Sequence, residues 1–212
     1  MTGRASIADI LRNGFEATKK NASTVLALFV GLHAVVFILA YVLNASFLNI
    51  LMVPVVLFMQ IALLKTYKTP ITKFDINDIL DLKDTHLKSK LWKLFLTYVI
   101  YAVLIILLLL LLVVPGIIFM VYWYVFPYVV LDQHLSGMAA LKKSREMIKG
   151  NWWRTFALFV IALLIGAISS SVVTGISGTN AFMAGLLMSV VSGLISVYFG
   201  YVGVAYYLSL KR

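Results

Sequence analysis

Residues 114–153, VPGIIFMVYWYVFPYVVLDQHLSGMAALKKSREMIKGNWW, decide the fold. A Pro-Gly pair opens the stretch inside an uncharged apolar run, and the first charge comes at Asp132. After Ser136 the composition changes to that of a short basic amphipathic helix, which ends near Gly150. This order is typical of a helix that leaves a membrane and is followed by a helix on the membrane surface.

Composition indicates that the whole chain is an integral membrane protein. Of its 212 residues, 62% are hydrophobic and 12% are charged, whereas a soluble domain carries about 25% charged residues. There is no cysteine, which excludes disulfides, thiolate nucleophiles and cysteine-bound metals. Because residues 1–22 are polar and amphipathic, unlike a signal peptide, we expect the N-terminus to be retained.

The positions of the basic residues predict how often the chain crosses the bilayer. With six spans, all 18 Lys and Arg fall in segments on one side, and an odd number of spans would divide them between two sides. Basic residues concentrate on the cytoplasmic side, so we expect both termini in the cytoplasm. The expected spans are 23–43, 46–64, 92–112, 114–131, 155–174 and 182–208.

An internal repeat divides this single membrane domain, residues 1–212, into three units. A shift of 130 residues aligns 6–30 with 136–160, and nine of the 25 aligned residues are identical. Four of the identical pairs are polar: Ser6 with Ser136, Glu16 with Glu146, Lys19 with Lys149, and Asn21 with Asn151. The predicted unit is an interfacial helix followed by a two-span hairpin. The units are 6–64, 72–131 and 136–208, and three parallel units predict a pseudo-threefold bundle about the membrane normal.

Two further segments are expected to form amphipathic surface helices on the cytoplasmic side. In residues 6–20, Ser6 and Asp9 have the spacing of a capping box, and one face is apolar: Ile7, Ile10, Leu11, Phe15. The second segment, residues 72–87, carries an acid every third position: Asp75, Asp78, Asp81, Asp84. Such a ladder is compatible with divalent cations, but interleaved lysines favour a solvated helix face.

Helix breaks and aromatic residues organise the middle of the chain. Pro115 and Gly116 are the only break in the long uncharged run and are expected to separate spans three and four. Residues 122–128 are rich in aromatic side chains and contain Pro127. They could line a groove for a lipid or amphiphile, although anchoring and packing are the interpretation that we favour.

Spans five and six carry small residues at helical spacing. Such stripes let helix backbones approach closely, and we expect these two spans to pack on each other, although a homodimer contact uses the same chemistry. The residues are Ala162, Gly166 and Ser170 on span five, and Ser192, Ser196 and Gly200 on span six.

A family resemblance rests on the following residues: Val114-Pro115-Gly116-Ile117, Pro127, Val130-Leu131-Asp132, Ala140-Leu141, Ser144 and Lys149-Gly150-Asn151-Trp152. This pattern resembles the membrane domain fused to some bacterial glycerophosphodiester phosphodiesterases and the related YciC-like inner-membrane proteins. The resemblance implies a six-span protein of the bacterial cytoplasmic membrane. It does not carry over the phosphodiesterase activity, because the soluble catalytic barrel is absent from this chain.

The same motif has architectural roles that follow from its chemistry. Pro115 suits the first turn of a helix, Asp132 marks the membrane exit, and Ser136 is placed to cap the surface helix. Gly150 can end that helix in a left-handed conformation, and Trp152 can anchor the return into the membrane.

The basic residues around the third surface helix are candidates for binding anionic lipid headgroups. They are Lys142, Lys143, Arg145, Lys149 and Arg154. These segments lack the interleaved aromatic residues of a nucleic-acid surface, so we expect no nucleic-acid partner.

Residues that could carry catalysis are scarce. All eight carboxylates lie outside the expected spans, and the three histidines have no metal-ligand spacing. His33 is the only histidine expected inside a span, where we favour a packing role. We therefore expect no catalytic residue, no metal and no cofactor.

The leading functional hypothesis is a non-enzymatic protein that binds or moves lipid or another amphiphile, or supports the cell envelope. An interaction or immunity protein that acts with a transporter or toxin partner is the alternative. An intramembrane enzyme that uses His33 is the third.

Overall fold

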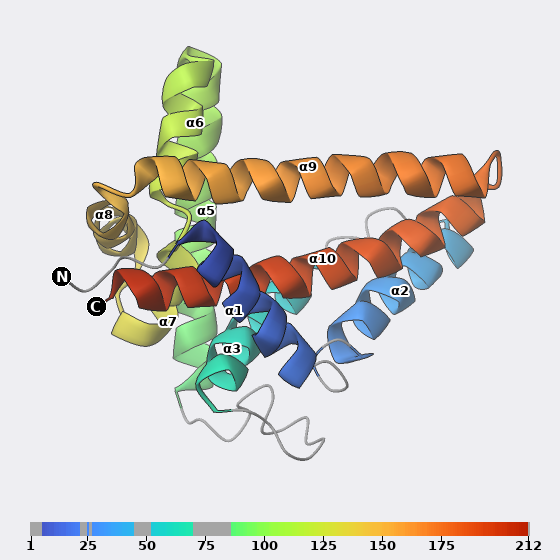
Figure 1. The fold of residues 1–212 in the computed structure, drawn as a ribbon, viewed down its shortest axis with the longest axis horizontal. Helices are drawn as coiled ribbons and strands as arrows, with labels where there is room; N and C mark the ends of the chain where they lie inside the picture. Colours follow the sequence, from blue (N-terminus) through green and yellow to red (C-terminus); the bar gives the residue numbers. More distant parts are fainter. Residues whose placement is uncertain (1–5, 22–24, 26, 45–51, 70–85, 212) are drawn as a thin grey trace.

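A computed structural model describes residues 6–21, 25, 27–44, 52–69 and 86–211 (Figure 1). The all-helical fold class predicted from the sequence is confirmed, since every element described is a helix. The acidic ladder and the start of the second repeat unit fall outside the described residues. The elements are α1 (Ile7–Lys20), α2 (Ala27–Val42), α3 (Met52–Lys68), α5 (Leu87–Leu111), α6 (Val113–Tyr122), α7 (Phe126–Gln133), α8 (Gly137–Ile148), α9 (Trp152–Ser177) and α10 (Ala181–Leu210).

Four helical segments in the described part of the chain are long and apolar enough to cross a membrane. They are α5, the α6–α7 segment Val113–Gln133, α9 and α10. The other two expected spans contain shorter helices, since α2 has 16 residues and α3 has 17, or roughly 25 Å each at 1.5 Å per residue. The structure therefore supports a membrane protein, while the six crossings, the repeats and the location of the termini stay predictions.

The break between α5 and α6 lies at Leu112, whose backbone is extended (φ −158°, ψ 123°). Pro115 follows within the first turn of α6, where a missing N–H costs nothing because the residue four positions earlier, Leu111, lies outside this helix. Gly116 then lets the two helices approach, because a Cβ there would lie 3.2 Å from the backbone nitrogen of Leu109. The chain thus reverses direction with almost no loop.

The expected fourth span is interrupted between α6 and α7. Pro127 lies in the first turn of α7 and cannot donate the hydrogen bond that a continuous helix would need at that position. Residues before it form hydrogen bonds to the carbonyl three residues earlier, rather than four as in an α-helix. For example, the Tyr124 N–H donates to the Val121 carbonyl. The same proline that was expected near the end of a span therefore starts a separate short helix.

The protein core lies where α3, α7 and α10 end. Each helix is buried on all sides there, at residues 61–64, 125–131 and 200–207. The Tyr128 hydroxyl donates to the Gly200 carbonyl at 2.9 Å, so α7 is joined directly to α10. Gly200 also receives the side chain of Leu63, which brings α3 to the same place. The last helices of the three predicted repeat units therefore meet at one end of the molecule.

The far ends of the long helices expose apolar side chains. Leu110, Leu111 and Ile176 are each more than 70% exposed, and no charge lies near them in the sequence. In water such surfaces would drive aggregation, whereas hydrocarbon solvates them. In Figure 1 the α5–α6 hairpin runs across the α9–α10 hairpin, so these apolar ends point in different directions.

The first surface helix forms as predicted at its N-terminus but is not free on the surface. The capping box is present, since the Asp9 N–H donates to Ser6 Oγ at 3.1 Å and the Ser6 N–H donates to Asp9 Oδ2 at 3.1 Å. The Ser6 hydroxyl also donates to Asp9 Oδ2 at 2.7 Å, and this bond, followed by the one from the Ser6 N–H, lowers the pKa of Asp9. Gly14 permits α1 to pack on α10, because a Cβ there would lie 3.0 Å from the Cα of Val202.

The small residues of α9 and α10 are arranged differently from the expected pairing. A Cβ added to Gly166 on α9 would meet nothing within 4 Å, and one added to Gly200 would meet Leu63 of α3. Ser170 is exposed, while Ala162, Ser192 and Ser196 are half-buried. The tightest approach to α10 is therefore made by other helices, although α9 does run beside α10.

Candidate functional site

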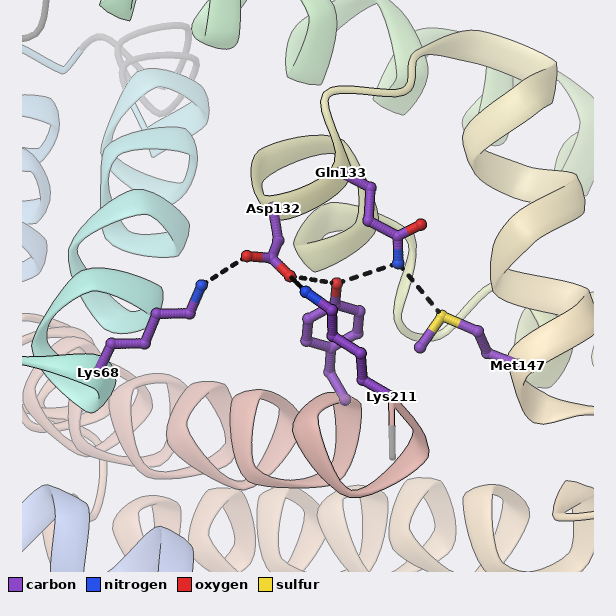
Figure 2. Close-up of polar contacts among 6 residues, drawn as sticks. Lys68, Asp132, Gln133, Met147 and Lys211 are labelled. Atoms are coloured by element: carbon purple, nitrogen blue, oxygen red, sulfur yellow. Dashed lines mark hydrogen bonds and ion pairs between the residues drawn. The ribbon is translucent and has the colours of Figure 1, made fainter.

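The ends of three helices are joined by one carboxylate, Asp132, at the end of α7 (Figure 2). Its two oxygens receive the ammonium groups of Lys68 from α3 at 2.5 Å and Lys211, just after α10, at 2.7 Å. The hydroxyl of Tyr207 on α10 donates to the second oxygen at 2.6 Å. Gln133 extends the group, because its Nε2 donates to Tyr207 Oη at 3.2 Å.

This carboxylate serves as a structural junction. Its side chain is only 9% exposed, and all the donors around it come from other helices. Two ammonium groups and one phenol satisfy the two oxygens, so the group offers no unpaired base for catalysis. The sequence predicted Asp132 only as a membrane exit, and the junction follows from the meeting of α3, α7 and α10.

A second charged region lies beside α8 and is open to solvent. A groove of about 380 Å³ is lined by Tyr122, Lys142, Arg145, Glu146 and Lys149. Residues 142, 145 and 149 are spaced by three and four, which places them on one face of the helix. The opposite face of α8 is fixed to the protein, because Ser144 is buried and its hydroxyl donates to the Tyr122 carbonyl at 2.9 Å.

Two aromatic rings at the end of α6 hold the central cation of this groove. The guanidinium carbon of Arg145 lies 5.6 Å from the ring centre of Phe119 and 5.7 Å from that of Tyr122. Attraction between a cation and an aromatic face contributes about 0.5–1 kcal/mol at an exposed site. It orients the guanidinium plane while its N–H groups stay able to donate.

The five basic residues predicted as headgroup contacts divide into three groups. Lys142, Arg145 and Lys149 line the groove together. Lys143 does not line the groove and pairs with Glu146, which does, at 3.4 Å. Arg154 belongs to α9 and does not line the groove.

The motif residues near the groove have clear structural partners. Gly150 has φ +86° and ends α8. Ser136 occupies the N-cap position of α8, but its side chain makes no capping bond there. The Gly137 N–H donates instead to Thr97 Oγ1 at 2.9 Å, which ties α8 to α5. The Trp152 ring stacks on Phe156 with a centre separation of 5.1 Å and packs at the start of α9.

Groups that could hold a metal ion are not assembled in the described residues. No three His, Asp or Glu side chains gather there. The His33 ring is engaged within its own helix, where Nδ1–H donates to the Phe29 carbonyl at 2.7 Å.

Sequence reasoning missed Phe119 as a contact of Arg145, and it missed Lys68 and Lys211 as contacts of Asp132. The aromatic band and the basic termini were both visible in the sequence, but no local pattern indicates which helix ends meet.

Comparison of the chain with protein-family models, curated proteins and solved structures found no match. The family resemblance therefore stays a prediction.

Proposed function

We propose that this protein is a non-enzymatic integral membrane protein that binds the phosphate groups of anionic lipids in the groove beside α8. The observation that carries the proposal is the placement of Arg145 over Phe119 and Tyr122, with Lys142 and Lys149 on the same helix face. The rings belong to an apolar segment, and the cations belong to a solvated helix. Their junction is where the headgroup layer of a bilayer would lie.

The chemistry of the groove suits a phosphate. A guanidinium can donate two parallel hydrogen bonds to phosphate oxygens, and two flanking ammonium groups add charge without fixed geometry. Each basic residue near an anionic surface contributes about 1 kcal/mol. Glu146 also lines the groove, but its pair with Lys143 offsets its charge.

The cytoplasmic orientation is part of the same proposal. Lys68, Asp132 and Lys211 lie at the ends of α3, α7 and α10, and they meet in one group. Ends that meet must lie on one side of the bilayer, which supports an even number of crossings. The excess of basic residues on that side makes it the cytoplasmic face, with both termini inside the cell.

The test is lipid retention by the purified full-length chain, measured by native mass spectrometry. Equal amounts of phosphatidylglycerol and phosphatidylcholine with the same acyl chains are offered in detergent. The wild type should retain the anionic lipid preferentially. Arg145→Ala should lower that retention about fivefold, which corresponds to the loss of about 1 kcal/mol.

Arg12→Ala is the matched control, because it removes the same exposed guanidinium charge from a different surface helix, outside the groove. It should change retention by less than twofold. Equal losses in the two variants would show diffuse attraction to a basic helix and would contradict a headgroup site.

A further inference from the structure

A second groove lies between α1 and α3. Its volume is about 580 Å³, and its α1 wall includes Glu16, Lys19, Lys20 and Asn21, with Tyr67 on the α3 side. Lys68, the next residue on α3, belongs to the Asp132 junction, so this groove is near the end of the molecule where α3, α7 and α10 meet. The groove therefore lies beside the C-terminal end of α3, where the apolar part of that helix meets its charged residues.

One wall of this groove contains a buried acceptor without a donor. Asn21 is 3% exposed, and its Nδ2 donates to the Ala17 carbonyl at 3.0 Å. Its Oδ1 is buried and has no hydrogen-bond partner. Buried amide oxygens are almost always paired, because an unpaired one keeps the full cost of losing water. The groove therefore lacks a hydrogen-bond donor at this position.

The charges of the groove are also unpaired. Glu16 precedes Lys19 and Lys20 by one helical turn, yet no ion pair joins it to either lysine or to another described residue. Its counterpart in the third predicted repeat unit, Glu146, pairs with Lys143. The residue equivalent to Lys143 is Asn13, which has no charge to offer. Among the described residues, Glu16, Lys19 and Lys20 have no ion-pair partner, so the α1 groove presents a free carboxylate together with two free ammonium groups there.

We propose that the α1 groove binds a phosphate ester that also carries a primary ammonium group, as in the headgroup of an aminophospholipid. Lys19 and Lys20 bind the phosphate, and Glu16 and Asn21 Oδ1 accept hydrogen bonds from the ammonium. The α8 groove differs, because its carboxylate is already paired and its centre is a guanidinium. The two grooves thus select zwitterionic and anionic headgroups respectively.

The inference takes from the proposed function only that the ligand comes from a bilayer, and it does not need the α8 groove to be occupied. It also makes a distinction between two headgroups of equal net charge. A trimethylammonium group has no N–H and cannot satisfy Asn21 Oδ1, whereas a primary ammonium can donate three hydrogen bonds. The α1 groove should therefore prefer ethanolamine-type over choline-type headgroups.

The experiment is a competition between phosphatidylethanolamine and phosphatidylcholine with identical acyl chains, measured by native mass spectrometry of the full chain. The wild type should retain the ethanolamine lipid at least fivefold over the choline lipid. Glu16→Gln should reduce that preference to less than twofold, and Asn21→Ala should reduce it similarly. The matched Glu146→Gln variant should leave it unchanged.

Other outcomes would overturn the proposal. Equal retention of the two lipids by the wild type would do so, and so would an unchanged preference in Glu16→Gln, which alters an exposed side chain and leaves the fold intact. Stabilisation by soluble phosphoethanolamine without retention of the lipid would assign the groove to a soluble ligand instead. Phosphatidylglycerol retention in Arg145→Ala reports separately on the α8 groove, so the two sites can fail independently.

Discussion

Replacing Asp132 by asparagine tests whether this carboxylate joins α3, α7 and α10. The substitution keeps the size of the side chain and an oxygen that can accept from Tyr207, but it removes the charge that holds Lys68 and Lys211. The carboxylate is 9% exposed, while the lysine side chains are 44% and 50% exposed. The loss of each ion pair should therefore lower the free energy of unfolding by about 1 kcal/mol, a value between those of exposed and buried ion pairs.

The expected loss in the free energy of unfolding is thus about 2 kcal/mol for the two contacts together. The larger penalty of about 3–5 kcal/mol for a stranded buried charge does not apply, because both ammonium groups can turn towards water. Asp132→Ala should cost about 1 kcal/mol more, since the Tyr207 hydroxyl then loses its acceptor as well.

The assay is reversible unfolding of the purified chain in mixed micelles with increasing sodium dodecyl sulfate, followed by tryptophan fluorescence. Glu146→Gln serves as the control, because its partner Lys143 is 42% exposed and Glu146 itself is 68% exposed. That substitution should cost less than about 0.5 kcal/mol. If Asp132→Asn were no more destabilising than Glu146→Gln, Asp132 would not be the junction described here.

The same geometry predicts three further results. Gly14→Ala should destabilise the protein by about 1–3 kcal/mol, because the added methyl meets α10, whereas Gly31→Ala, where a Cβ meets nothing within 4 Å, should be neutral or stabilising in the same unfolding assay. The pKa of Asp9 is lowered in the folded state, so its support for α1 is present above the ordinary pKa of about 4 and is lost as pH falls through the lowered value. The protection of α1 amides against hydrogen exchange, measured relative to their intrinsic exchange rates, should fall over that acid range. Asp9→Asn should remove this pH dependence of the protection. Since the chain has no cysteine, Thr179→Cys and Glu146→Cys should react with an impermeant thiol reagent from opposite sides of the membrane, and labelling from the same side would contradict the predicted topology.

Local features of this protein could be predicted from the sequence because they depend on neighbouring residues. The capping box at Ser6, the chain reversal before Pro115 and the basic face of α8 each follow from spacing within one or two helical turns. Ser136 shows the limit of such reasoning, since it stands at the N-cap position while Thr97, from another helix, accepts the neighbouring N–H.

The α9–α10 contact was predicted and is present, but the faces on which the long helices pack could not be predicted in the same way. In a soluble protein the buried face of a helix is more apolar than the exposed face, and the periodicity shows which side packs. In a bilayer both faces are apolar, so the pattern of α9 and α10 carries little information about orientation. This is why Gly200 was expected to pack on α9 but packs on Leu63 of α3.

The sequence by itself determined the class of this protein, a helical membrane chain with basic surface helices, because run length and charge position are set locally by the cost of placing polar groups in hydrocarbon. Only the tertiary structure decided which charges meet. Asp132 contacts Lys68 and Lys211, 64 and 79 residues away, and Arg145 lies over two rings of another helix. Such contacts depend on how each helix is rotated and where it crosses its neighbours, and that arrangement results from packing the whole chain at once.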